Sequence, residues 1–289
     1  MYYLGRILLI FSFLQISLLG DSENRIPFYE DYLKKGDLNG FLKVAERFLS
    51  ENPDSVEAPR LAFDFLLVAK AAQDIDAIDF ATSRLLFNFP NSLPTVHLLS
   101  SFDKRSPALL KLLKGKVDAS DMENNEFAIN FCRTLLLIAK IQGPEILKDS
   151  GLRLRSFLMA KKAGVQSIIE NSKKGLILES KGKGSNAKIS SIILSDSGPM
   201  EKLVQLSGLS GSEVKFCVSF YLSELTEKER NSEEVKTIKI KQALFSGERK
   251  SVLAQELIDS LPASTRSSPK YQLLLAHAKY LNDLSLIHI

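Results

Sequence analysis

GDLNGFLKVAERFLSENPDS (Gly36–Ser55) and AQDIDAIDFATSRLLFNFPNS (Ala72–Ser92) decide the fold class of this chain. The two stretches share a pattern of residue types, and each matched position recurs 37 residues later. The matched pairs are Asp37 with Asp74, Ala45 with Thr82, Pro53 with Pro90, and Ser55 with Ser92. A fixed period of this size is typical of repeat proteins, in which each unit buries its apolar surface against the next.

Each repeat is expected to consist of two antiparallel helices joined by a short turn. Asp37 and Asp74 precede apolar-periodic stretches, where a carboxylate can accept hydrogen bonds from the unpaired N–H groups of a helix start. Pro53 and Pro90 are expected to end the second helix, because proline disfavours helical geometry in the residue before it. The stretch between the repeats, 56–72, carries apolar residues on more than one face and predicts a helix buried between neighbours.

This pattern resembles tetratricopeptide-like repeats, in the variety from bacterial envelope proteins whose units end in aromatic-Pro-[Asp/Asn]-Ser. The resemblance covers about Ile26–Leu99 and rests on Gly36-Asp37, Ala45, Phe48, Asn52-Pro53-Asp54-Ser55, Asp74, Ala77-Ile78 and Phe89-Pro90-Asn91-Ser92. It implies an all-α fold, a right-handed superhelix of antiparallel helix pairs with a divergent middle segment. It also implies a scaffold without catalysis of its own, which binds a protein or peptide partner in the cell envelope.

The concave face of such a stack is lined by the first helix of each pair. The residues expected to face a partner there are Tyr29, Tyr32, Arg60, Phe63 and Asp64. A core position between helices is an equally good interpretation of Phe63 and Tyr29.

The pattern weakens after Ser100, and the expected organisation is helical repeats over 21–180, a loop or hinge over 181–198, and further helical repeats over 199–283. KGKGSNAK (181–188) has the Gly, Ser and Lys content of a loop. The alternatives are two domains hinged there, or a β-hairpin formed by Leu176–Leu178 and Ile189–Leu194. Towards the C-terminus, helices are predicted over Ser212–Arg230 and after Ser232 as an N-cap.

The first twenty residues, MYYLGRILLIFSFLQISLLG, have one cation, Arg6, followed by an apolar run and Gly20. This layout predicts a signal peptide over 1–20, cleaved near Gly20 or Ser22, and hence a protein that is periplasmic or secreted. The alternative is an uncleaved N-terminal anchor.

Charge is unevenly distributed along the chain. From Arg133 to Lys188 there are 12 Lys and Arg residues against 4 Asp and Glu residues, a segment named here the basic segment 133–188. It could face an acidic protein, an anionic polymer or anionic lipid, and the alternative is that its lysines are solvated helix faces. Because aromatic residues are not interleaved with these cations, nucleic acid is not an expected partner.

The sequence offers no recognisable catalytic or metal-binding pattern. His97 and His277 each stand alone in an apolar helical stretch. Gly182-Lys183-Gly184-Ser185 lacks the spacing of a phosphate-binding loop. Neither enzyme activity, a cofactor nor a metal is therefore expected. The two cysteines, Cys132 and Cys217, are either buried thiols or partners in one disulfide.

The last six residues, LSLIHI (Leu284–Ile289), match the in-frame translation of a transposase adapter used in sequencing libraries. They are expected to be an artefact, with the natural chain continuing past Asp283. An alternative function follows, in which the helices are the N-terminal accessory region of a larger envelope enzyme whose catalytic domain lies beyond Asp283.

Overall fold

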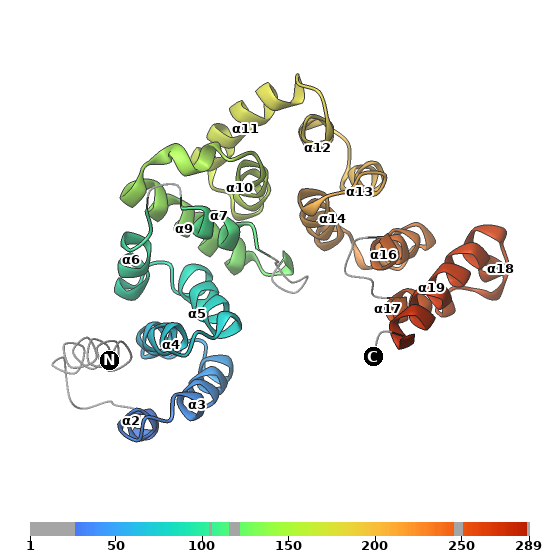
Figure 1. The fold of residues 1–289 in the computed structure, drawn as a ribbon. Coiled ribbons are helices and arrows are strands. Elements are labelled where there is room, and N and C mark those ends of the chain that lie inside the picture. Colours follow the sequence, from blue (N-terminus) through green and yellow to red (C-terminus); the bar gives the residue numbers. More distant parts are fainter. Residues whose placement is uncertain (1–26, 104–105, 116–121, 246–250, 288–289) are drawn as a thin grey trace. The chain divides into compact units, whose positions relative to one another are not determined.

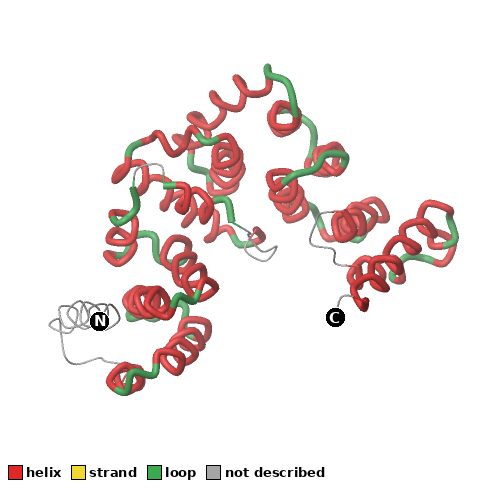
Figure 2. The backbone as a smooth tube through the Cα atoms, in the orientation of Figure 1, coloured by secondary structure: helices red, strands yellow, loops and turns green. Residues whose placement is uncertain are grey.

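The computed structural model describes residues 27–103, 106–115, 122–245 and 251–287. Within these ranges the regular elements are seventeen α-helices and one 3₁₀ helix, without a strand (Figure 2). The predicted all-α fold class is confirmed. Among the helices described, none is both long and apolar enough to cross a membrane. The predicted signal peptide, 1–20, lies outside the described residues.

The described residues divide into two compact units. The N-terminal unit holds the described residues up to Gly115 together with Glu126–Asp149, and the C-terminal unit holds those of 116–125 and those from Ser150 onward. The division before Ser150 differs from the hinge that the sequence suggested near 181–198.

The N-terminal unit is built from helices that pack in chain order, α2 on α3, α3 on α4 and α4 on α5, with α4 also contacting α6 (Figure 1). Its helices are α2 (Pro27–Lys34), α3 (Leu38–Glu51), α4 (Ala58–Ala72), α5 (Ile75–Phe87), α6 (Leu93–Ser100), α7 (Pro107–Leu113), α9 (Asn125–Gln142) and the 3₁₀ helix η1 (Pro144–Lys148).

The two predicted aspartate caps are confirmed. The Asp37 carboxylate accepts a hydrogen bond from the Gly40 backbone N–H at 2.8 Å and begins α3. The Asp74 carboxylate accepts one from the Ala77 N–H at 3.0 Å and begins α5. Both helices also end before their prolines, as predicted, α3 at Glu51 and α5 at Phe87.

Aromatic side chains hold these helices together. The Phe65 ring of α4 is 1% exposed, and its centroid lies 6.5 Å from Phe41 of α3 and 5.6 Å from Phe80 of α5. Further along, Phe87 of α5 stacks on Phe131 of α9 with centroids 5.8 Å apart. Such ring pairs add specific geometry to the burial of apolar surface. The core therefore runs through successive helix interfaces.

The C-terminal unit also packs mainly through successive helices, from α10 on α11 to α16 on α17, with additional contacts of α10 with α14 and of α16 with α19. Its helices are α10 (Ser150–Ala163), α11 (Gln166–Ser180), α12 (Ser185–Leu194), α13 (Pro199–Ser207), α14 (Ser212–Glu224), α15 (Glu227–Arg230), α16 (Glu233–Phe245), α17 (Ser251–Asp259), α18 (Ala263–Arg266) and α19 (Pro269–Ile287).

The segment 181–198, expected to be a loop or hinge, contains a helix between two short loops. α12 occupies Ser185–Leu194, and the loop before it is only 181–184. The β-hairpin alternative is wrong, because both of its strands lie in helices, α11 and α12. Ile189, Ser190 and Ile193 are all buried, and a helix places these three positions on one side, whereas a strand would turn the neighbours 189 and 190 to opposite faces.

The single helix predicted over Ser212–Arg230 is two helices. α14 ends at Glu224, and α15 begins after Thr226. Thr226 Oγ1 accepts from the Glu229 N–H at 3.3 Å, while the Glu229 carboxylate accepts from the Thr226 N–H at 2.9 Å. This reciprocal capping box stabilises a new helix start inside the expected helix.

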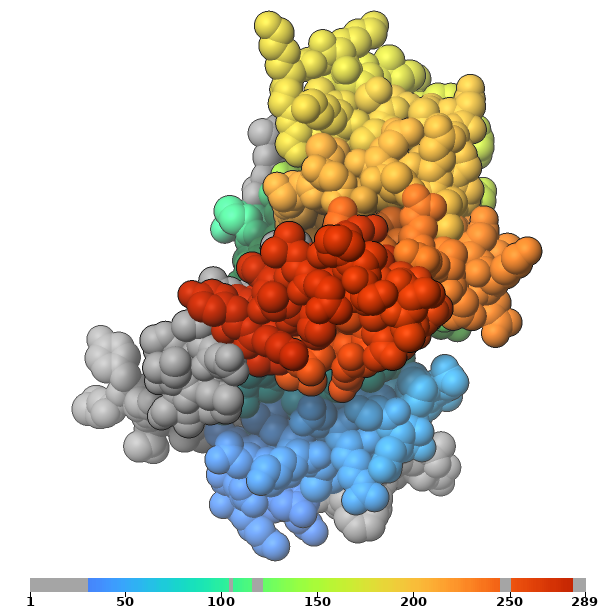
Figure 3. Space-filling view, turned by 90° about the vertical axis from the view of Figure 1, so that its right-hand side faces the viewer, coloured from blue at the N-terminus to red at the C-terminus, as the bar shows by residue number. Residues whose placement is uncertain are grey.

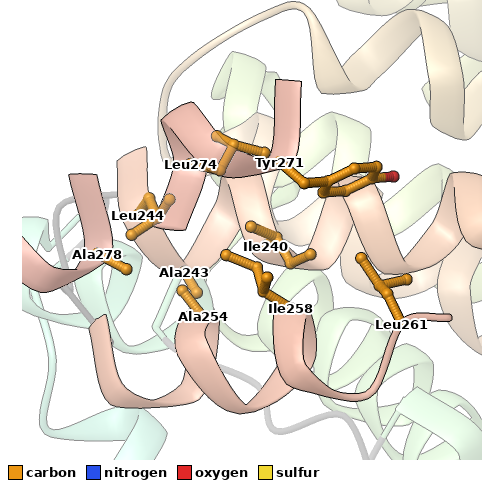
Figure 4. Packing of buried hydrophobic residues seen from close by; sticks show 9 residues of the cluster. All are labelled: Ile240, Ala243, Leu244, Ala254, Ile258, Leu261, Tyr271, Leu274 and Ala278. Atoms are coloured by element: carbon orange, nitrogen blue, oxygen red, sulfur yellow. The ribbon is translucent and has the colours of Figure 1, made fainter. Parts of the chain in front are cut away.

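The last three long helices share one apolar cluster. Side chains of α16, α17 and α19 point toward one another in it (Figure 4). The predicted cap Ser232 precedes α16 and accepts from the Val235 N–H at 3.3 Å, which confirms that prediction. Tyr271 is buried in the cluster, and its hydroxyl hydrogen-bonds to the hydroxyl of Thr237. The buried members are Ile240, Ala243, Leu244, Ala254, Ile258, Leu261, Tyr271, Leu274 and Ala278.

Candidate binding surfaces

Helix α4 brings three of the predicted partner-facing residues onto one side. Arg60, Phe63 and Asp64 are three and four positions apart, and Leu67 extends the same face by a further turn. Arg60, Phe63 and Leu67 are half-buried, whereas Asp64 is 5% exposed. These four residues are named here the α4 stripe, and every other residue between Arg60 and Ala69 is buried.

The opposite side of α4 fixes how the stripe faces. Leu61, Phe65 and Val68 are almost fully buried, and Phe65 contacts rings of both neighbouring helices. On α5, the guanidinium of Arg84 lies 5.2 Å from the centroid of the Phe80 ring, which covers the outer side of that aromatic group. Rotation of α4 would break these contacts, so the stripe is a fixed surface.

Asp64 is a buried carboxyl group within this stripe. Burial raises its pKa to about 6, because the carboxylate loses solvation. The positive charge of Arg60, one turn away, acts in the opposite direction and lowers that pKa. At neutral pH the carboxyl group is therefore mostly ionised, and the positive charge of Arg60 attracts it.

The two predicted tyrosines belong to another helix. Tyr32 of α2 is half-buried and packs on the backbone of α3, since a Cβ placed on Gly40 would come within 2.5 Å of the Tyr32 ring. Gly40 is thus needed for this close approach. The backbone of Tyr29 lies in α2, and its side chain is outside the described part of the structure.

Several cations of the basic segment 133–188 point inward. Arg155 of α10 is 3% exposed, and its guanidinium lies 4.5 Å from the centroid of the Phe216 ring on α14. Lys162, also on α10, forms an ion pair of 2.9 Å with Glu224 and lies over the Phe220 ring. These cations stabilise the α10–α14 interface.

A further buried cation lies outside that segment. Lys202 of α13 is 4% exposed, and its ammonium group donates to the backbone carbonyl of Ile193 at 3.0 Å. Burial lowers the pKa of Lys202, and the charge of Lys161 adds to that effect. The contact satisfies a carbonyl in the last turn of α12, which is a structural role. Hydrophobic periodicity gives no signal for a buried lysine, so the sequence did not indicate it.

Helix α11 and its C-cap place three further cations of the basic segment outward. Lys173, Lys174 and Lys181 are exposed, and they lie on the same side as two apolar residues, Ile177 at 39% and Leu178 at 72% exposure. The five residues are named here the α11 stripe. The opposite side of the helix is buried through Ile168, Ser172 and Leu176.

The cysteines and histidines do not form a reactive centre within the described residues. Cys132 and Cys217 are both buried and unpaired, as the buried-thiol alternative predicted. Burial raises the pKa of Cys132 to about 12 and that of Cys217 still further. In the ranges that the structure describes, no group of His, Cys, Asp and Glu side chains could hold a metal ion.

Comparison of the chain with protein-family models, with curated proteins and with solved structures returned no match. The α4 and α11 stripes are therefore the features from which a function can be proposed.

Proposed function

We propose that the protein is an exported helical-repeat scaffold that binds a segment of another protein along the α4 stripe. The observation that carries this proposal is the incomplete cover of α4. Although α3, α5 and α6 all contact this helix, Arg60, Phe63 and Leu67 stay half-exposed along one line.

The chemistry of the stripe suits a peptide better than a small metabolite. It combines a guanidinium, an aromatic ring and an aliphatic side chain over two helical turns, the arrangement of anchors that a bound helix or extended segment meets. Phe and Arg are also frequent at protein interfaces. The segment we propose as ligand has an acidic residue opposite Arg60 and apolar residues opposite Phe63 and Leu67.

The repeat interpretation supports the same proposal. Asp37 and Asp74 cap consecutive helices with the same geometry at an offset of 37 residues. Stacked helix pairs with this regularity form elongated surfaces whose first helices face a ligand. We therefore propose a superhelix of helix pairs of the tetratricopeptide-like kind.

Photo-crosslinking in the native host tests the partner. A benzophenone amino acid replaces Phe63, and the matched control carries it in place of Phe48, a half-buried aromatic residue of α3. We expect one discrete cross-linked species from position 63, lost on Arg60→Glu, and none in common with position 48. The same diffuse products from both positions would exclude the α4 stripe as the binding surface.

Export is proposed from the N-terminal sequence alone and has its own test. Met1–Gly20 has the layout of a signal peptide. N-terminal sequencing of the protein recovered from the cell envelope is expected to begin between Asp21 and Glu23. Recovery of the unprocessed chain from the cytoplasm would exclude this part of the proposal and leave the peptide-binding part to the cross-linking result.

A further inference from the structure

We propose that the α11 stripe is a docking surface for an anionic phospholipid bilayer. This activity goes beyond the peptide binding proposed for α4, and it uses a different helix in the other compact unit. α11 and α12 form the yellow surface in Figure 3.

The stripe combines lysines with exposed apolar side chains in one line. At about 3.6 residues per turn, Lys173, Ile177 and Lys181 lie on top of one another, and Lys174 and Leu178 form the adjacent line. Leu178 is 72% and Ile177 39% exposed. A helix with lysines beside exposed aliphatic residues is typical of segments that lie at the interface of a membrane.

The charge of this face is largely uncompensated. Within the described chain, Lys173, Lys174 and Lys181 form no ion pair. The one exposed acid of the helix, Glu170, lies one turn before Lys173 and Lys174 and also accepts from the Gln166 amide at 3.0 Å, so it offsets only part of the charge of the three lysines. Unpaired lysines on one face attract an anionic surface.

The other acid of α11 points away from the stripe. Glu179 accepts a hydrogen bond from the Ser190 hydroxyl at 3.1 Å, and its second oxygen accepts from the Ser150 hydroxyl. Its negative charge is therefore directed toward α10 and α12. Beyond the helix, Lys183 and Lys188 are also exposed.

The inner side of α11 keeps the stripe facing outward. A Cβ on Gly175 would come 2.4 Å from the Arg153 side chain, so the side chain of this α10 residue packs directly on the α11 backbone. Leu176, the next residue, is fully buried. Because the inner side of α11 is packed, the helix cannot rotate to bury Ile177 and Leu178. Both side chains stay in water unless an apolar phase outside the protein covers them.

A bilayer explains both parts of the stripe, whereas a soluble polyanion explains only one. Each lysine near an anionic membrane strengthens binding by about fivefold. Ile177 and Leu178 gain further free energy only if they enter the boundary between headgroups and acyl chains. A polyanionic polymer offers no such region.

The test uses the full chain with an environment-sensitive dye on Leu178→Cys. The matched control is Leu273→Cys on α19, because Leu273 is 73% exposed and Leu178 is 72% exposed. Helix α19 belongs to the red region of Figure 3. Vesicles of phosphatidylglycerol with phosphatidylcholine are compared with vesicles of phosphatidylcholine alone. The dye shifts only if α11 itself enters the membrane, and the control dye at position 273 shows what binding through another part of the chain would produce.

We expect a blue shift at position 178 on anionic vesicles only, and none at position 273. The double variant Lys173→Glu with Lys181→Glu should weaken vesicle binding measured by this dye about 25-fold or more. Lys228→Glu with Lys241→Glu, two exposed lysines of α15 and α16, should leave it within about twofold.

Three results would overturn the proposal. The first is an unshifted dye at position 178 on anionic vesicles. The second is equal binding by the two lysine variants. The third is Ile177→Ser with Leu178→Ser binding vesicles as tightly as the native chain in a sedimentation assay, while poly-glutamate competes fully. That third result would assign the surface to soluble polyanions through charge alone.

Discussion

Different side-chain contacts hold the helices α3 to α5 together and the helices α10 and α14 together. In the N-terminal unit, Phe65 packs against Phe41 and Phe80, so the contact is apolar on both sides. In the C-terminal unit, Arg155 lies over Phe216 and Lys162 over Phe220, so cations from α10 meet aromatic rings of α14.

Only one of these two kinds of interface is visible in the sequence. An apolar interface leaves a periodic pattern, because each buried position must be apolar. An interface of cations on rings leaves charged letters at buried positions, which pattern reading assigns to solvent. Substitutions in each of the two interfaces test this difference.

The largest expected effect is in the apolar interface. Phe65→Ala should lower the free energy of unfolding by about 3–5 kcal/mol, because it removes a buried ring that two neighbouring rings contact. Urea denaturation followed by circular dichroism measures it. Phe63→Ala, on the half-covered side of the same helix, is the control and should cost clearly less. Equal losses would mean that the two faces of α4 are equally packed.

The next largest effect concerns Asp64, the polar exception in that interface. Its pKa is about 6 in the folded protein against 3.8 for an ordinary Asp side chain, so the folded state binds more protons between those values. Stability should therefore fall as pH rises from about 4 to about 6, by roughly 3 kcal/mol in total, and stay level above that.

Asp64→Asn should remove this dependence. Unfolding free energies of both proteins are compared across that pH range. Above pH 6 the variant should be more stable than the native chain, and the loss of the attraction between Asp64 and Arg60 makes this gain smaller. A difference between the two proteins that does not change with pH would show that the carboxyl group is not buried as described.

A third, intermediate effect tests the cation-bearing interface. Phe216→Leu keeps an apolar side chain but removes the ring beneath Arg155, and a desolvated cation–π contact contributes up to about 2 kcal/mol. Its control is Phe131→Leu in α9, whose ring stacks on Phe87. Such a swap by itself costs about 1 kcal/mol. We expect Phe216→Leu to lower the thermal midpoint further than Phe131→Leu does, and equal shifts would remove the distinction between the two interfaces.

The smallest effect tests the repeat. Asp37→Ala and Asp74→Ala should each cost about 1 kcal/mol, because each removes one N-cap acceptor of similar geometry. Asp79→Ala, an exposed position within α5, should stay within about 0.5 kcal/mol of the native chain. A much larger loss of stability from one substitution than from the other would contradict the equivalence of the two repeats.

The sequence predicted the elements whose signals are local. The caps Asp37, Asp74 and Ser232 could be identified because capping needs only a suitable side chain at a helix start. The same kind of signal was present at Thr226 and Glu229, spaced as a capping box, but the apolar run before it suggested one continuous helix.

The errors lie where tertiary contacts decide. KGKGSNAK looks like a loop, yet α12 begins at Ser185 and buries Ile189, Ser190 and Ile193 among the neighbouring helices. Arg155 and Lys202 could not be assigned to the interior, because nothing local distinguishes a buried cation from a solvated one. On α4, spacing placed Arg60, Phe63 and Asp64 on one side, but the degree of burial of Asp64 needed the packing of the neighbouring helices.

The two buried thiols can report the unfolding of the two compact units. The chain has no Trp and only two cysteines, and Cys132 lies in the N-terminal unit while Cys217 lies in the C-terminal unit. Each thiol is protonated and enclosed when its unit is folded, and therefore inert to alkylating reagents. Timed alkylation followed by peptide mass spectrometry would thus record separately the moment at which each half of the native chain comes apart, without any label having been introduced.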